Sequence, residues 1–152
     1  MKRLLCVLLF ALMCSGCSLP ESNEALLEFN DNCEFGGAML GMTVEGMEEA
    51  LGEPDAESII TGGTEYAYHL LDLSAAINDE GVVRRLSGKN GDFRVFGIAV
   101  GDDLTAAGDV LLEKGYQRDA APGYRYNKNE VQIILLTVDE EAVVGFTAEW
   151  LN

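Results

Sequence analysis

The residues with the most reactive chemistry in this 152-residue chain are its four cysteines and its single histidine. Cys6, Cys14 and Cys17 lie near the N-terminus, and only Cys33 falls in the body of the chain. One thiol cannot form an internal disulfide, so we expect the apolar core to hold the fold together. Cys33 and His69 could form a nucleophilic dyad, but the sequence offers no third group to orient the histidine.

We expect Cys33 to be a small buried apolar residue, because no Lys, Arg or His stands near it in the sequence to lower the pKa of its thiol. We expect His69 to be a surface or half-buried residue. The sequence has no zinc-ligand spacing, no phosphate-cradling glycine loop and no calcium-loop motif. These patterns predict a protein that is not an enzyme and that has no metal site and no cofactor.

Adjacent carboxylates occur at Asp79-Glu80, Asp102-Asp103 and Asp139-Glu140. We interpret them as solvated residues of turns and helix caps. Weak calcium binding is the alternative. It would make the protein a ligand-binding or calcium-binding sensor of the cell envelope.

The chain is strongly acidic, with 26 Asp and Glu against 10 Lys and Arg and a net charge of -16. Such a surface repels nucleic acid and anionic lipid headgroups, so we expect both to be poor partners of the folded part and predict no binding of nucleic acid. The acidity suits a soluble exported domain, or a domain with a basic partner.

Residues 1–16 have the pattern of a secretory signal, because a basic start is followed by an apolar run and then by small residues. The run is too short to span a bilayer, which needs about 20 apolar residues. Ser15, Gly16 and Cys17 resemble the bacterial lipobox, with Cys14 at a position usually held by Leu. That resemblance implies cleavage before Cys17 and anchoring of the protein to the extracytoplasmic face of a membrane by acyl chains on Cys17. In a Gram-negative host the outer membrane is a further option, and a secreted protein without acyl chains is the alternative.

Residues 17–34 are polar and acidic at first, and they predict a tether between the lipidated cysteine and the folded body. Ser22 could cap a short helix inside this segment, with Ala25, Leu26 and Phe29 on one side.

The body of the chain contains an internal repeat. Residues 41–53 return loosely as residues 101–113, and the offset of sixty positions continues without a gap into the segments that follow. A repeat of this length is one supersecondary unit used twice. We therefore divide the body into unit 1, residues 35–91, and unit 2, residues 92–152.

Each unit is expected to contain one amphipathic helix and three strands. The helices follow from apolar residues at helical spacing: Val44, Met47, Ala50 and Leu51, then Leu104, Ala107, Val110 and Leu111. Thr43 and Asp103 stand at the cap positions. The expected strands cover residues 66–70, 71–77, 82–87, 124–127, 131–138 and 142–151. We predict an α+β fold in which two tandem units of about 60 residues form an antiparallel sheet platform with helices on one face.

Aromatic residues on the expected strands are candidates for a protein-binding surface: Tyr66, Tyr68, Tyr124, Tyr126 and Trp150. Tyr66 and Tyr126 stand one repeat apart, which favours a structural role for that pair. Tyr68, Tyr124 and Trp150 do not repeat, so we expect them to be surface contacts on an aromatic face of the sheet. The alternative is that all five belong to the core.

One pattern in unit 1 is carried by Gly41, Met42, Thr43, Met47, Leu51, Gly52, Pro54, Asp55, Tyr66, Asp79, Gly81, Val82 and Val83. With these residues the repeat resembles a known superfamily. It includes the small outer-membrane lipoproteins of the β-barrel assembly machinery (SmpA/OmlA type) and the β-lactamase inhibitor proteins, which are built from two such units. In unit 2, Asp102-Asp103 replaces Met-Thr, and Lys114-Gly115 replaces Pro-Asp. The resemblance implies a helix-plus-sheet fold that serves as a non-catalytic binding module for an unidentified protein.

Overall fold

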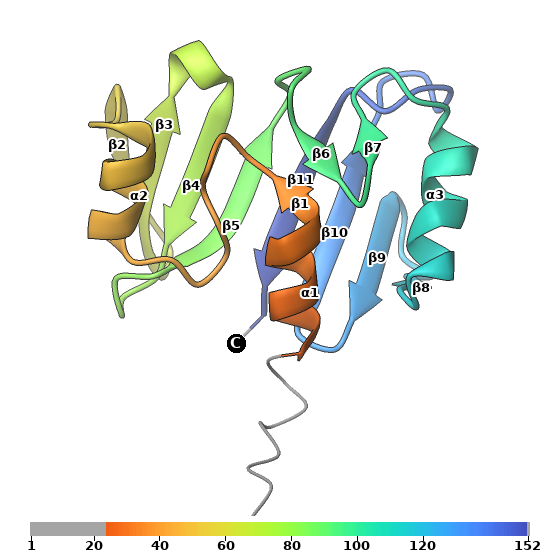
Figure 1. The fold of residues 1–152 in the computed structure, drawn as a ribbon, viewed down its shortest axis with the longest axis horizontal. Helices are drawn as coiled ribbons and strands as arrows, with labels where there is room; N and C mark the ends of the chain where they lie inside the picture. The colour runs from red at the N-terminus through yellow and green to blue at the C-terminus, as the bar shows by residue number, and fades with distance from the viewer. Residues whose placement is uncertain (1–23, 152) are drawn as a thin grey trace, which may run out of the picture.

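The computed structural model describes residues 24–151, which form an α+β body around one large antiparallel sheet (Figure 1). The predicted signal segment 1–16 and the predicted lipidation site Cys17 lie outside the described residues. The helices of the described part are α1 (Glu24–Asn32), α2 (Val44–Leu51), α3 (Leu104–Glu113) and a 3-10 helix, η2 (His69–Leu71). The prediction of an α+β fold with a large antiparallel sheet is confirmed.

The large sheet contains eight strands in the order β2-β3-β4-β5-β11-β10-β9-β8. These strands are β2 (Ala56–Ile60), β3 (Gly63–Tyr68), β4 (Leu73–Ile77), β5 (Val83–Gly88), β8 (Gln117–Arg118), β9 (Tyr124–Lys128), β10 (Val131–Leu136) and β11 (Gly145–Trp150). A separate small sheet has the order β1-β6-β7, with β1 (Cys33–Glu34), β6 (Arg94–Val95) and β7 (Ile98–Ala99).

The two halves of the chain meet in the middle of the large sheet, where β5 pairs with β11. Ser87 faces Thr147 across this pair, and their hydroxyl oxygens are 2.9 Å apart. These two residues are 60 positions apart in the sequence. Hydrogen bonding therefore runs without interruption from strands of the first half to strands of the second.

Main-chain contacts elsewhere also recur sixty positions apart. The N–H of Gly41 donates to the carbonyl of Val83 at 2.7 Å, and the N–H of Gly101 donates to the carbonyl of Val143 at 2.8 Å. In the first half this bond ties the segment before α2 to the first residue of β5, and in the second half it ties the segment before α3 to the segment before β11.

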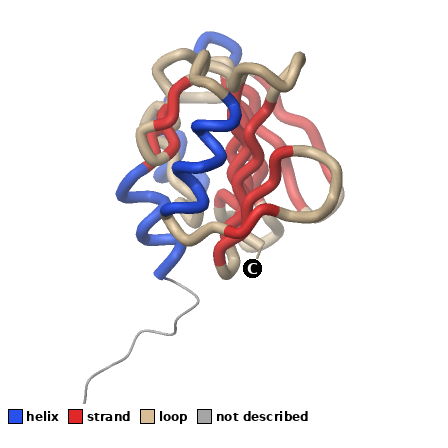
Figure 2. Tube along the Cα trace, turned by 90° about the vertical axis from the view of Figure 1, so that its right-hand side faces the viewer, coloured by secondary structure: helices blue, strands red, loops and turns tan. Residues whose placement is uncertain are grey.

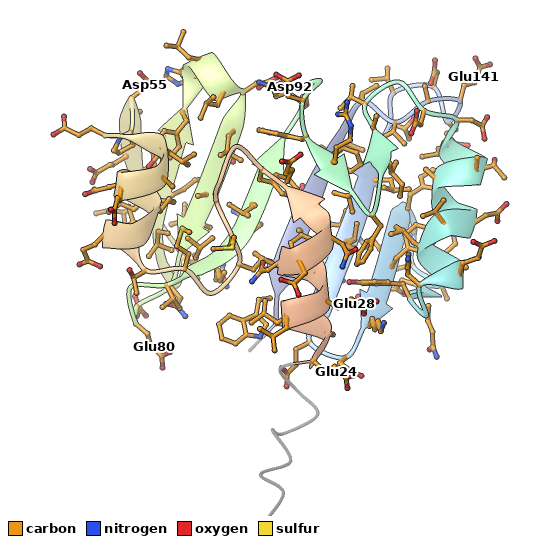
Figure 3. All side chains as sticks on the ribbon, in the orientation of Figure 1. Glu24, Glu28, Asp55, Glu80, Asp92 and Glu141 are labelled. Atoms are coloured by element: carbon orange, nitrogen blue, oxygen red, sulfur yellow. The ribbon has the colours of Figure 1, made fainter. Side chains whose placement is uncertain are left out.

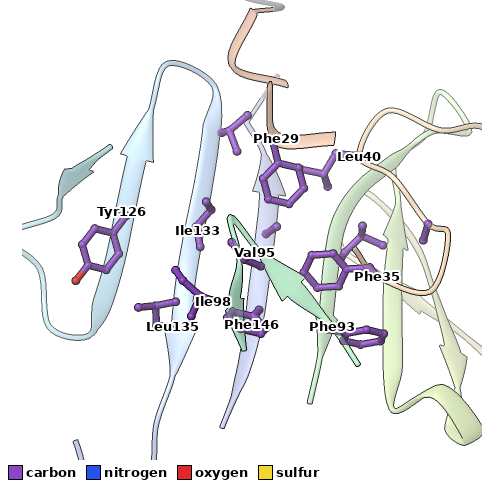
Figure 4. Packing of buried hydrophobic residues seen from close by; sticks show 14 of the residues in the cluster. Phe29, Phe35, Leu40, Phe93, Val95, Ile98, Tyr126, Ile133, Leu135 and Phe146 are labelled. Carbon is purple, nitrogen blue, oxygen red and sulfur yellow. The ribbon is translucent and has the colours of Figure 1, made fainter. Parts of the chain in front are cut away.

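The three α-helices and the small sheet lie on one side of the large sheet, as the side view in Figure 2 shows. Between these layers lies a core rich in phenylalanine (Figure 4). The ring of Phe35 lies 5.2 Å from that of Phe93 and 6.5 Å from that of Phe146, between centroids. Phe35 comes from the segment after β1, Phe93 precedes β6, and Phe146 lies on β11, so the core joins both halves of the chain.

Helices α2 and α3 begin where the sequence predicts. The hydroxyl of Thr43 accepts a hydrogen bond from the N–H of Gly46 at 3.2 Å, which caps α2. A carboxylate oxygen of Asp103 accepts one from the N–H of Ala106 at 2.8 Å, which caps α3. Both side chains satisfy N–H groups that have no partner inside the helix.

The predicted tether is shorter than residues 17–34, because its second part belongs to the folded body. Residues 24–34 form α1 and β1, and Ala25, Leu26 and Phe29 are buried against the rest of the core. The short helix expected from these three residues is therefore confirmed, whereas its proposed cap lies outside the described residues.

Strand boundaries also differ from the prediction. The expected strands 66–70 and 71–77 are separated by η2, after which Asp72 takes a left-handed conformation with φ of 47° and reverses the chain. The strand over residues 56–60 was not predicted, because its residues are largely exposed and show no alternation of apolar and polar side chains.

The contact between α3 and β9 leads to a first prediction. A Cβ added at Gly108 would stand 2.3 Å from the hydroxyl oxygen of Tyr126, whereas one at Gly46 in α2 would stand 3.2 Å from the flexible side chain of Met42. We expect Gly108→Ala to lower the free energy of unfolding by about 1–3 kcal/mol. Gly46→Ala should instead be neutral or stabilising by up to about 1 kcal/mol, because alanine favours a helix.

Urea denaturation of both variants measures this difference. Tyr126→Phe removes the oxygen that clashes, so the double variant Gly108→Ala/Tyr126→Phe should recover part of the loss. Equal effects of the two alanine substitutions would contradict the packing of α3 against Tyr126.

Candidate functional site

The five aromatic residues expected to contact a partner all lie on the helix-covered face of the large sheet. Residues that face each other on neighbouring strands point to the same side of a sheet. Tyr66 pairs with Ala75 and Tyr126 pairs with Ile133, and both partners have no exposed surface. An exposed sheet face rich in aromatic residues, as the sequence suggested, is therefore not present among the described residues.

Tyr68 and Tyr126 belong to the core. Their exposed fractions are 4% and 2%, and burial raises the pKa of both hydroxyls. Tyr68 was expected to be a surface contact, and this expectation is wrong, because its side chain packs between the sheet and the helix layer. Its hydroxyl also lacks a hydrogen-bond partner among the described residues.

The register of the strands decides which tyrosine of the second half takes the position in the sheet that Tyr66 takes in the first half. Tyr66 faces Ala75, whereas Leu135, sixty positions after Ala75, faces Tyr124 and not Tyr126. The connection from β3 to β4 is two residues longer than the connection from β9 to β10, and this shifts β9 by two positions. Tyr66 thus occupies the place of Tyr124, so the match of Tyr66 with Tyr126 holds in the sequence but not in space.

Tyr66, Tyr124 and Trp150 are half-buried at the edges of this covered face. The indole ring of Trp150 lies against Gly41, where an added Cβ would be 3.6 Å from the ring. The guanidinium of Arg118 lies 4.7 Å from the centre of the Tyr124 ring. These contacts are internal, and they leave each ring only partly accessible to a partner.

The opposite face of the large sheet carries polar and charged side chains. We call this surface the open face and define it by two cross-strand rows: Glu65, Ala76, Arg85, Glu149, Gln132 and Asn127, then Ala67, Ser74, Ser87, Thr147, Ile134 and Arg125. All the α-helices of residues 24–151 lie on the other side (Figure 2). The open face is therefore the largest regular surface that the sheet presents to solvent.

Interactions between side chains hold the open face in a defined arrangement. A guanidinium nitrogen of Arg85 lies 3.0 Å from a carboxylate oxygen of Glu65, and the amide of Gln132 donates to Asn127 at 2.8 Å. Because neighbouring strands fix the spacing of these groups, the surface offers donors and acceptors at set positions.

A shallow depression of about 340 Å³ opens beside the centre of this face. Its lining includes Ser74 and Ser87 from the sheet and His69, Asp72 and Lys89 from the connections at one end. These polar groups can donate to and accept from a bound main chain or side chain. The sequence contained a signal for part of this surface, since Ser87 and Thr147 are polar residues sixty positions apart that follow the apolar residues Leu86 and Phe146.

Cys33 and His69, the residues of the proposed dyad, lie in different settings. Burial is the main reason that the pKa of the Cys33 thiol rises to about 12, and Glu28 adds to the effect. The side chain of His69 is 71% exposed, and its main-chain N–H donates to a carboxylate oxygen of Asp55 at 2.6 Å. A thiol that stays protonated is a poor nucleophile, so the geometry supports no thiol chemistry at Cys33.

The acidic turns use their carboxylates within the fold. An oxygen of Asp102 accepts a hydrogen bond from the N–H of Ala99 at 2.8 Å, and Asp139 accepts one from the N–H of Glu141 at 3.1 Å. Hydrogen bonds from the main chain lower the pKa of Asp139. Within residues 24–151, no group of three or more His, Cys, Asp or Glu side chains is arranged to hold a metal ion.

Comparisons with known proteins add a likeness of fold. No family model matches the sequence, and no curated protein matches it. The structure resembles that of an extracellular protein containing a SCP domain from Bacillus anthracis str. Ames, with a TM-score of 0.58 and 13% sequence identity. The match covers 72% of this chain and 43% of that chain, so this chain spans less than half the length of that protein. At this identity the likeness shows the fold alone.

None of the helices in the described part of the chain is long and apolar enough to cross a membrane.

The state of Cys33 gives a second prediction. With a thiol pKa of about 12, alkylation of Cys33 by iodoacetamide at pH 8 should be slower in the folded protein than in urea by a factor of roughly 100 or more. A chain in which Ser replaces Cys6, Cys14 and Cys17 leaves this thiol alone, and mass spectrometry measures the reaction. Cys33 is half-buried, so fast labelling without denaturant would contradict the raised pKa of its thiol.

The same shift predicts a pH dependence of stability. In the unfolded chain the thiol ionises near its ordinary pKa of 9.0, whereas the folded chain keeps this proton up to about pH 12. The contribution of Cys33 to the free energy of unfolding is therefore complete below pH 9 and is lost as the pH rises from 9 to about 12. In the Cys33→Ala variant the free energy of unfolding should therefore decrease less steeply with pH in that range.

Proposed function

We propose that this protein is a membrane-anchored extracytoplasmic lipoprotein that acts as a non-catalytic protein-binding module. The observation that carries the proposal is the open face, because six paired strands, β3 to β5 and β9 to β11, present a regular polar surface on the side opposite all the described α-helices. Surfaces of this kind bind through shape and through positioned hydrogen-bonding groups rather than through a reactive centre.

The arrangement of ionic groups supports binding rather than catalysis. Arg85 is paired with Glu65, and Arg84 lies 3.9 Å from Glu149, so most of the charge on this face is already balanced. A partner that covers this surface would exchange solvent contacts for contacts with fixed polar groups, which favours specificity over raw affinity.

We also propose that the sheet is built from two tandem units that derive from one repeated module. The recurrence of the bonds from Gly41 to Val83 and from Gly101 to Val143 supports this division, as does the pairing of Ser87 with Thr147 at the join. The units differ from one another where partner contacts would be expected, for example in the loop lengths beside β3 and β9.

The proposed location rests on the signal pattern and on Cys17. The structural neighbour is described as an extracellular protein, which is in keeping with an exported fold of this type. Acyl chains on Cys17 would hold the body near a membrane, and the acidic surface would keep it from lying flat on anionic lipid.

The anchor can be tested by labelling with an alkyne fatty acid in a bacterial host. We expect the full chain to incorporate the label and to fractionate with membranes. Cys17→Ser should abolish both, whereas the matched variant Cys14→Ser should keep them, because only Cys17 follows Ser-Gly at the proposed cleavage site. Incorporation that survives Cys17→Ser would contradict the proposed anchor.

The binding surface can be tested by photo-cross-linking in whole cells. A photoreactive amino acid in place of Thr147 or Gln132 lies on the open face, and one in place of Glu113 lies on the exposed side of α3 as a control. We expect discrete adducts with another protein from the first two positions and none above background from the third. Adducts only from Glu113 would show that the partner binds the helix side instead.

A further inference from the structure

We propose that β2 is a docking edge at which an extended, basic segment of a partner protein adds as a ninth strand of the large sheet. This inference goes beyond the proposed function, because it names a second surface and the chemistry of the segment that it binds. It does not depend on the lipid anchor or on the open face.

The first observation is that β2 ends the sheet with an unpaired edge. It pairs with β3 on one side, and none of the described residues forms a strand on its other side. A two-residue turn joins Ile60 to Gly63, so this pair is hydrogen-bonded, and the bonding alternates along the strand. Glu57 and Ile59 therefore direct their main-chain N–H and C=O groups away from β3.

The second observation is that this edge lacks the usual protection. Edge strands are commonly kept free by lysines, by prolines or by being very short. The opposite edge of the sheet, β8, has only two residues and carries Arg118. In contrast, β2 has five residues with no lysine or proline, its one charged side chain is that of Glu57, and Ile59 is 94% exposed. An exposed apolar side chain on an open edge provides both a main-chain template and an anchor.

The third observation is the charge around β2. Exposed carboxylates gather on α2, on β2 and on the turn between them: Glu45, Glu48, Glu49, Glu53, Asp55 and Glu57. Figure 3 shows the side chains of this end of the molecule, with Asp55 labelled beside β2. Met47 is the buried residue of α2, and Ala50, which was expected on its apolar side, is exposed, so this short helix turns most of its surface outward.

No Lys or Arg balances this charge within the same part of the sequence, and the imidazole of His69 lies 4.0 Å from a carboxylate oxygen of Asp55. Between Leu4 and Val83 the chain contains no Lys and no Arg, and His69 is its only histidine. The carboxylates of Glu57 and Glu48 also act together on one neighbouring group, since after burial they are the causes that raise the pKa of Tyr66. The edge of β2 thus lies in a region of concentrated negative potential.

This negative charge decides which kind of strand can pair with the edge of β2. A second copy of the same chain would place two acidic edges side by side, and like charges facing each other across strands are destabilising. A segment with lysine or arginine at alternate positions would instead pair its charges with Glu57 and the carboxylates of α2 while its main chain bonds to the edge. Charge complementarity therefore favours a basic segment over self-association.

The proposal can be tested with the full chain purified in a non-ionic detergent, whether the chain is recovered with membranes or in soluble form. The probe is a synthetic peptide of alternating lysine and valine that is long enough to cover β2, and a peptide of alternating glutamate and valine serves as the control. We expect the basic peptide to bind, the affinity to fall with added salt, and the amides of Glu57 and Ile59 to gain protection from hydrogen exchange. Absence of binding, or protection confined to other strands, would overturn the proposal.

Two variants at one position separate main-chain addition from a side-chain contact. Ile59→Pro removes an N–H that faces solvent, and an edge strand tolerates proline at such a position. Ile59→Ala keeps the N–H and removes the apolar side chain. We expect the proline variant to bind the basic peptide about tenfold more weakly than the alanine variant, which is the effect of one lost main-chain hydrogen bond. Equal affinities would overturn strand addition.

Two controls keep this result interpretable. Exchange measured on the unsubstituted chain does not depend on whether the proline variant folds, and a melting curve of each variant checks its fold. Glu48→Gln/Glu49→Gln should weaken binding, while Glu113→Gln on α3 should not.

Protection of β2 that rises with protein concentration in the absence of peptide would show self-pairing and would reject the basic segment as the occupant. The cross-linking result at Thr147 is independent of all these outcomes.

Discussion

The structure depends on the pairing of β5 with β11. Without it, each half of the chain would present a four-stranded sheet with two free edges and one short helix to cover it. The pairing removes two of those edges and brings the Ser87 and Thr147 hydroxyls together at the centre of the sheet. It also places Phe146 beneath Phe35, so that a single core spans both halves.

A shared core explains why the helix layer is uneven. Segment α1 and the small sheet cover the middle of the large sheet, where the two halves join, and α2 and α3 cover its outer parts (Figure 1). The central rings pack closely, whereas α2 buries only Met47 completely. The outermost strand β2 therefore has little apolar cover, and its stability rests mainly on its pairing with β3.

The open face and the surface around β2 and α2 differ in their chemistry. On the open face, acidic and basic side chains are paired, as Arg85 with Glu65, and their positions are set by the strands. Around β2 and α2 the carboxylates have no such partners nearby in the sequence. The first surface is suited to specific recognition at short range, and the second attracts basic segments from a distance.

The sequence by itself determined the fold class, the caps Thr43 and Asp103 and the apolar side of α1, because each depends on residues close together in the chain. The tertiary structure alone decided which face of the sheet is covered, and therefore that Tyr68 is buried. An alternating strand pattern shows that one side is buried but does not say against what. The two-residue difference in loop length that moves Tyr126 out of register with Tyr66, and the unpaired state of β2, likewise follow from contacts between distant segments, which local periodicity cannot encode.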